Sequence, residues 1–289
     1  MASVRDIRRH IRSVYNIKKI TKTMEMVASA RMQKTSSALL ASRPYARLAW
    51  TLLKDLSSKT ERELHPLLRS RPECRHCMVV LLTSDRGLCG AFNMNVIHEA
   101  LNLAGDKEHA SFICIGKKGR DYLMRRGYNV IAEFSSLSAP VNFLQVGPIA
   151  QIVIKEYTSG NVDEVNVVYG DYISHMVQKP TVLKLLPLQK VSGRVEGPET
   201  AAGEYIYEPT AQEVVSQLVP RIIEYQVYAS ILESQTSEFA ARMIAMRNAT
   251  DNAQQLIKYL TLTYNKARQE GITKELTELS SSKLVIEEQ

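Results

Sequence analysis

The C-terminal third of the chain carries a regular heptad pattern of apolar and small residues. The pattern spans residues 232–267, and the distance between successive members alternates between four and three positions. Its members are Leu232, Thr236, Phe239, Met243, Met246, Thr250, Ala253, Ile257, Leu260, Tyr264 and Ala267. Such a repeat predicts one helix of a left-handed coiled coil.

A second apolar stripe in the N-terminal segment offers a partner for that helix. Its members are Ile7, Ile11, Val14, Ile17, Ile20, Met24 and Val27. Their spacing keeps one face of an α-helix apolar. Pro44 predicts a kink or an interruption of this helix. We expect helices in residues 1–60 and 210–289 to pair antiparallel within one chain, although the heptads alone also permit a homodimer.

Positive charge is concentrated in the N-terminal helix. Residues 1–56 contain twelve Lys and Arg and three acidic residues, a net charge of +9, whereas the whole chain has a net charge of +7. The rest of the chain therefore carries −2. A localised positive charge predicts an acidic protein surface, a nucleic acid or an anionic membrane face as partner. Aromatic side chains that could stack on bases are almost absent from the start of this helix, apart from Tyr15.

The middle of the chain alternates between short apolar runs and short helical patterns. "CMVVLLTS" at 77–84 is typical of a buried strand, and strands at 111–116, 128–134, 163–172 and 181–189 follow. Helical patterns at 91–105, 119–127 and 146–160 lie between them. This alternation predicts a mostly parallel α/β domain over residues 75–190. Residues 191–209 begin with a Gly/Pro-rich stretch and are interpreted as a linker.

No motif in this domain predicts catalysis. "SDRGLCGAFN" at 84–93 and "IGKKGR" at 115–120 follow strands, where phosphate would bind, but neither matches a dinucleotide-binding or P-loop pattern. We interpret both as structural turns. The histidines do not cluster, and no nucleophile, metal set or paired carboxylates can be assigned. We therefore expect no active site, no metal site and no bound cofactor in this chain.

The cysteines favour a reducing compartment. "CRHC" places Cys74 and Cys77 at a strand entrance, but no second pair of ligands accompanies them, so zinc is not favoured. A redox dithiol is possible in principle, and two unrelated cysteines are the simpler interpretation. No run of 18 apolar residues or signal peptide is present. The Arg-rich start also fits a mitochondrial presequence, but the stripe continues past it, which argues against removal.

Six segments together resemble the γ subunit of F-type ATP synthases. They are "ITKTMEMVASARM" (20–32), "SRPYA" (42–46), "SDRGLCGAFN" (84–93), "YIYEP" (205–209), "ARMIAMRNATDNA" (241–253) and "YNKARQEGITKELTEL" (264–279). The resemblance implies a central-stalk rotor without catalytic residues of its own. Its fold would be a long antiparallel coiled coil with an inserted Rossmann-like α/β domain. Two features depart from the family pattern, namely the charged tail at 280–289 and the Cys74/Cys77 pair.

The resemblance also implies partners and contact residues. The partners would be a ring of three α and three β subunits, which hold ATP or ADP with Mg²⁺, together with the ε subunit and the membrane c-ring. Contacts with β would involve Met24, Arg242, Arg268, Gln269, Thr273 and Glu275. Tyr205, Tyr207 and Glu208 would face the c-ring. The location would be peripheral, at the cytoplasmic face of a bacterial membrane.

Two other classes of function remain open at this level. A coiled-coil protein that binds nucleic acid would use the basic N-terminal helix, and its affinity would fall steeply with salt. A stand-alone nucleotide enzyme would use the α/β domain. Neither alternative explains the motifs at both ends of the chain.

Overall fold

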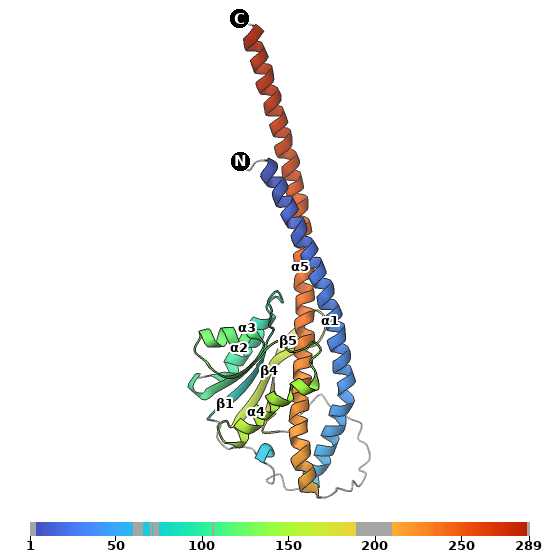
Figure 1. Cartoon of the computed structure of the whole chain (residues 1–289), viewed down its shortest axis with the longest axis vertical. Coiled ribbons are helices and arrows are strands. Elements are labelled where there is room, and N and C mark those ends of the chain that lie inside the picture. Colours follow the sequence, from blue (N-terminus) through green and yellow to red (C-terminus); the bar gives the residue numbers. More distant parts are fainter. Residues whose placement is uncertain are drawn as a thin grey trace. The chain divides into compact units, whose positions relative to one another are not determined.

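The computed structural model describes residues 4–59, 66–69, 71, 75–105, 107–188 and 210–287. Two long helices, α1 (Val4–Lys59) and α5 (Ala211–Glu287), flank a small α/β domain in the sequence (Figure 1). The chain divides into two compact units, one of residues 1–27 with 243–289 and one of residues 28–242. Each long helix therefore contributes to both units. The predicted linker at 191–209, with Tyr205, Tyr207 and Glu208, lies outside the described residues.

The α/β domain is a five-stranded sheet with helices on both faces. Its strands are β1 (Cys77–Leu82), β2 (Ala110–Ile115), β3 (Asn129–Phe134), β4 (Glu164–Tyr172) and β5 (Gln178–Leu186). Its helices are α2 (Phe92–Ala104), α3 (Lys117–Arg125) and α4 (Gly147–Thr158), with short 3₁₀ turns at Pro66–Leu68, Lys107–His109 and Phe143–Gln145. The sheet order is β3-β2-β1-β4-β5, with β5 antiparallel to β4 and the other pairs parallel. The predicted mostly parallel α/β domain is confirmed.

The central strand β1 is buried on both faces because helices cover both sides of the sheet. Val79 and Leu81 pack in one cluster with side chains of α2 and α3. Met78 and Val80 pack in a second cluster with α4 and with residues 219–232 of α5. The first part of α5 thus belongs to the core of the α/β domain.

Within each unit, α1 and α5 pair antiparallel (Figure 1). In the unit of residues 28–242, the Thr35 and Thr236 hydroxyls lie 3.0 Å apart and are buried. In the other unit, the Thr21 and Thr250 hydroxyls lie 2.8 Å apart, and the Lys18 ammonium donates to the Gln254 side chain. Residue numbers fall along α5 as they rise along α1, so the predicted single-chain antiparallel pair is confirmed.

The predicted stripe of α1 is wrong in its second half. Ile17 and Ile20 are 50% and 59% exposed, and Val27 is exposed as well. Lys18 and Thr21 make the contacts with α5 instead. The physical reason is that a coiled-coil helix follows a strict 3.5-residue period. Continued from the start of α1, this period brings polar residues to the seam and turns these apolar side chains outward.

The C-terminal heptad pattern is confirmed along its whole length. Its first members are buried, from Leu232 to Ala253 with Met243 half-buried, and the later members to Ala267 are half-buried. Burial thus decreases along α5 toward its C-terminal end. The seam alternates large with small residues, which allows close approach of the helices but buries less apolar area.

Pro44 does not interrupt α1, contrary to the prediction of a possible break. The helix continues through it from Val4 to Lys59. Tertiary contacts hold this stretch, since the Tyr225 hydroxyl donates to the Ser42 carbonyl at 3.0 Å. The rings of Tyr45 and Tyr225 also lie 5.3 Å apart. Such packing can offset the loss of one helical hydrogen bond at proline.

Candidate functional site

The loop between β1 and α2 lies where α/β folds commonly bind ligands, at the carboxyl end of a central strand. Its polar groups are used within the protein. The Ser84 backbone N–H donates to the Asn93 side chain at 2.9 Å, and the Ser84 hydroxyl donates to the Arg86 carbonyl at 2.6 Å. Asp85 accepts from the backbone N–H groups of Lys117 and Ser136 at 3.1 and 2.9 Å. This loop therefore ties together the ends of three strands.

The turn at residues 115–120 needs glycine because its backbone lies very close to the backbone of Thr83. Gly116 has φ +96°, and a Cβ at this position would lie 2.1 Å from the Thr83 carbonyl oxygen. Its N–H donates to the Phe134 carbonyl at 2.8 Å. A side chain would force the turn apart, so glycine is required here for packing.

Arg242 joins α5 to the β1–α2 loop. Its guanidinium donates to the Arg86 carbonyl at 3.0 Å, to the Gly87 carbonyl at 3.4 Å and to the Glu238 carboxylate at 2.5 Å. The side chains of Arg242 and Glu238 are only 11% and 15% exposed. We call this arrangement of Arg242, Glu238 and the two carbonyls the α5 clasp.

Burial sets the electrostatics of the clasp. Desolvation raises the pKa of the Glu238 carboxyl above its ordinary value, and the positive charges of Arg242 and Arg31 oppose this rise. The Arg242 guanidinium also lies 5.8 Å from the Phe239 ring. The carboxylate, the carbonyls and the ring together satisfy a planar, forked cation in a largely dry position. The clasp is therefore a structural connection within the unit of residues 28–242.

The free end of α5 carries four of the predicted contact residues. α1 begins in the description at Val4, and the last half-buried heptad member of α5 is Ala267. α5 continues to Glu287, about 30 Å farther. We call residues 268–287 the free end of α5. Its exposed side chains among the described residues include the predicted Arg268, Gln269, Thr273 and Glu275.

Large apolar side chains are exposed on both helices of the unit formed by residues 1–27 and 243–289. Ile17 and Ile20 on α1 point away from the seam, and on α5 Tyr259, Leu262 and Leu276 are each more than 60% exposed. The predicted Met24 is half-buried. A row of outward apolar residues along a helical pair indicates a surface covered by another protein. Sequence reasoning assigned Ile17 and Ile20 to the seam, and strict continuation of the heptad from Ile7 would have placed them outside it.

The described cysteines differ in burial. Cys77 is half-buried, and Cys89 and Cys114 are buried. Burial raises the pKa of the Cys114 thiol to about 12, so it stays protonated at neutral pH. Cys74 lies outside the described residues. Within the described ranges, no group of three or more His, Cys, Asp and Glu side chains could hold a metal ion.

Comparison with known proteins identifies the family. The family model described as ATP synthase matches residues 3–283. The ATP synthase gamma chain of Desulforamulus reducens is 39% identical over 287 residues, which cover 99% of this chain and all of the relative. The chain belongs to the ATP synthase gamma chain family. The gamma chain of Desulfitobacterium hafniense is 42% identical over 280 residues, covering 96% of this chain and 97% of the relative.

Chains of known structure share the fold of this protein. A chain of the Euglena gracilis mitochondrial ATP synthase (OSCP/F1/c-ring, rotational state 3) aligns with a TM-score of 0.69 and 20% identity, covering 98% of this chain and 94% of that one. A chain of the Tetrahymena thermophila mitochondrial ATP synthase (central stalk/c-ring) aligns with a TM-score of 0.64 and 24% identity, covering 80% and 99%. Among the described helices, none is long and apolar enough to cross a membrane.

Proposed function

We propose that this chain is the central-stalk rotor subunit of an F-type ATP synthase. It transmits rotation between a membrane c-ring and a catalytic ring of α and β subunits, and it thereby couples ion translocation to ATP synthesis or hydrolysis. Full-length likeness to gamma chains supports this role. The chain itself performs no catalysis, and ATP or ADP with Mg²⁺ binds to the α and β subunits.

The observation that carries the proposal is the free end of α5. A single helix of about 20 residues is marginal in water by itself. Here it carries exposed Ile272 and Leu276, and no α1 residue of the described range is available to pair with it beyond Ala267. A surrounding ring of α and β subunits would cover these side chains and stabilise the helix.

Coupling requires that the shaft be asymmetric. A shaft made of one helix at its end and two helices farther down has no threefold symmetry. The three β subunits around it therefore contact different sides of the shaft. Each β conformation then has a different interaction free energy with the shaft. Rotation of the shaft shifts each β subunit in turn toward another nucleotide state.

Individual contacts are proposed for the residues that lie on this surface. Arg268, Gln269, Thr273 and Glu275 on the free end would meet loops of β, and Met24 would lie lower on the same shaft. Arg242 would support coupling indirectly, because its guanidinium is engaged in the α5 clasp. Tyr205, Tyr207 and Glu208 would face the c-ring. The ε subunit would bind nearby, and the complex would place the chain at the cytoplasmic face of a bacterial membrane.

Reconstitution tests the proposal. The purified chain is mixed with the cognate α and β subunits, and complex formation and ATP turnover are measured for wild type and for Arg268→Ala/Gln269→Ala. A hydrogen bond to a charged group contributes about 1.5–3 kcal/mol, so we expect turnover to fall about tenfold or more in the double variant. The matched control is Gln151→Ala/Lys155→Ala, an exposed pair on α4, which should leave turnover unchanged. A wild-type chain that neither enters the ring nor alters its turnover would refute the rotor role.

A further inference from the structure

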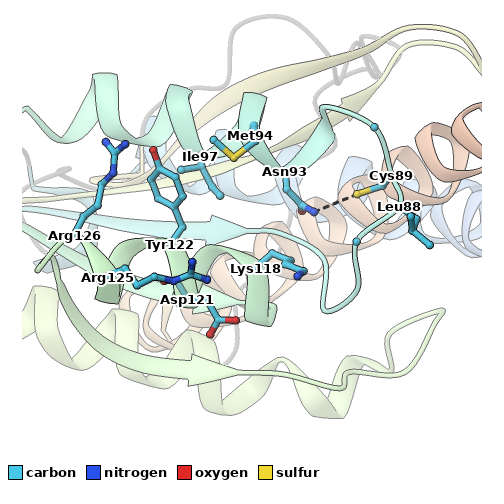
Figure 2. A pocket seen from close by; sticks show the side chains of 12 residues that line it. Leu88, Cys89, Asn93, Met94, Ile97, Lys118, Asp121, Tyr122, Arg125 and Arg126 are labelled. Atoms are coloured by element: carbon cyan, nitrogen blue, oxygen red, sulfur yellow. Dashed lines mark hydrogen bonds between the residues drawn. The ribbon is translucent and has the colours of Figure 1, made fainter.

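The surface formed by α2, α3 and the β1–α2 loop is hollowed. A cavity of about 430 Å³ lies between the helices and is open to solvent (Figure 2). This volume is within the range of natural ligand pockets. We call it the α2–α3 groove. It lies on the face of the sheet opposite α4. Gly87, whose carbonyl belongs to the α5 clasp, lines one end of it.

The middle of the groove is apolar. Met94 and Ile97 line it from α2, and the ring of Tyr122 lines it from α3 (Figure 2). Met94 is 41% exposed, and Leu88 at the loop end of the groove is 61% exposed. Leu88 also has φ +66°, a conformation that few non-glycine residues adopt. An exposed methionine beside an aromatic ring is an adaptable surface for an apolar side chain of a partner.

Cations stand at the two ends of the groove. Lys118 lies by the loop, and Arg126 lies at the far end, with Tyr122 between them (Figure 2). Lys118 and Arg126 are eight residues apart, which corresponds to a rise of about 12 Å along a helix. The Arg126 guanidinium lies 4.6 Å from the Tyr122 ring centroid, which keeps it at the rim.

The acidic residue at the groove is paired mainly with a cation outside the lining, and the charges of Arg125 and Lys118 act on it more weakly. Asp121 forms an ion pair with Arg120 at 2.6 Å, and this contact lowers the pKa of its carboxyl below the ordinary value. No carboxylate of the described residues pairs with Lys118 or Arg126 at ion-pair distance, and Arg125 adds a third positive charge to the lining. The groove therefore has an apolar middle and a positive rim.

We propose that the α2–α3 groove binds an acidic amphipathic helix of a partner protein. Carboxylates seven residues apart on a helix are separated by about 10.5 Å, which matches the spacing of Lys118 and Arg126. Apolar residues between them, on the same face, enter the cavity against Met94 and Tyr122. A compact anion such as phosphate could reach only one end of the groove and would leave its apolar middle uncovered.

A labelled peptide tests this proposal on the full chain. The probe is a fluorescein-labelled helical peptide with Glu at positions i and i+7, Leu or Phe at i+3 and i+4, and Ala and Gln elsewhere. Its affinity is measured by fluorescence anisotropy for wild type, for Lys118→Glu/Arg126→Glu and for Met94→Asp. The matched control is Lys155→Glu/Lys179→Glu, two exposed lysines outside the groove. Circular dichroism checks that each variant is folded.

We expect saturable binding to wild type, at least tenfold weaker binding to both groove variants, and unchanged binding to the control. Binding should also weaken with added salt, because the rim charges are exposed. Equal affinity for a scrambled peptide of the same composition, or equal loss in the control, would overturn the proposal. Complete displacement of the probe by an equimolar amount of inorganic pyrophosphate would indicate a small-anion site and would also overturn it.

Discussion

The guanidinium of Arg242 lies 3.0 Å from the carbonyl oxygen of Arg86, a residue 156 positions earlier in the chain. This hydrogen bond connects the coiled-coil helix α5 to the carboxyl edge of the sheet. In many α/β proteins that edge holds a ligand. In this chain, the Arg242 side chain of α5 lies at that edge and connects the α/β domain to the helix.

The α5 clasp should contribute substantially to stability. Arg242→Met leaves the buried Glu238 carboxylate without its ion-pair partner and removes one donor from each of the Arg86 and Gly87 carbonyls. Loss of one partner of a buried ion pair costs about 3–5 kcal/mol. We expect a loss of about that size in the free energy of unfolding measured by urea denaturation. Arg247→Met, at an exposed arginine on the same helix, should change it by less than about 0.5 kcal/mol. Equal effects of the two substitutions would contradict the clasp.

A double-mutant cycle can separate the ion pair from the carbonyl bonds. Glu238→Gln alone removes a buried charge and leaves Arg242 bonded to the loop. Combined with Arg242→Met, it should recover part of the lost stability, because no carboxylate then stays unpaired. Strict additivity of the two substitutions would show that Arg242 and Glu238 are not coupled.

The buried hydroxyls of Thr35 and Thr236 should behave as a pair. They lie 3.0 Å apart, and Thr236 also hydrogen-bonds to the Leu232 carbonyl. Thr236→Val leaves Thr35 facing a methyl group, and we expect a loss of about 1 kcal/mol in thermal or urea unfolding. Replacing both threonines by Val should be close to neutral, since neither hydroxyl is then left facing a methyl group. If the double variant loses more stability than the two single variants together, the two hydroxyls do not act as a pair.

Acid should weaken the Arg71–Asp163 connection. The Arg71 guanidinium donates to Asp163 at 2.9 Å, and backbone N–H groups of Arg75 and His76 also donate to its carboxylate. The hydrogen bond from Arg71 is the main cause that lowers the pKa of Asp163 below its model-compound value of 3.8. The stabilisation is therefore complete well above pH 3.8 and is lost as the pH falls through the lower, folded-state pKa.

Urea titrations between pH 3 and pH 6 measure this effect. Wild type should lose more stability than Asp163→Asn as the pH falls, so that the difference between them shrinks. A difference that is constant over this range would show that Asp163 does not contribute through its charge.

Cys114 should resist alkylation in the folded chain. It is completely buried, and its thiol has a pKa of about 12. At pH 8, iodoacetamide should leave Cys114 unmodified over hours and modify it within minutes in urea, as measured by peptide mass spectrometry. Rapid modification without denaturant would mean that β2 opens readily.

Local patterns predicted the helix pair and the α/β domain because the residues that form them are close in sequence. The heptads of α5 place an apolar or small residue at every seam position, so periodicity alone located the seam. In α1 the seam includes Lys18 and Thr21, and the apolar Ile17 and Ile20 lie outside it. Hydrophobicity was misleading there, because these isoleucines are available for another protein.

Contacts between distant residues could not be predicted in this way. The α5 clasp joins Arg242 to carbonyls of Arg86 and Gly87, and a backbone carbonyl has no signature in the sequence. Near Pro44, α1 is contacted by Tyr225, which is 183 residues from Ser42. The α2–α3 groove likewise depends on how two helices of moderate length pack on the sheet.

Direct observation of rotation tests the central claim. The ring of α and β subunits is fixed to a surface, and a bead is attached to the α/β domain through a cysteine introduced at the exposed Lys155, with Cys74 and Cys77 replaced by Ser. We predict that ATP drives rotation of the bead in one direction with three steps per turn, one for each β subunit. A complex that hydrolyses ATP at its full rate while the attached bead stays still would contradict the account.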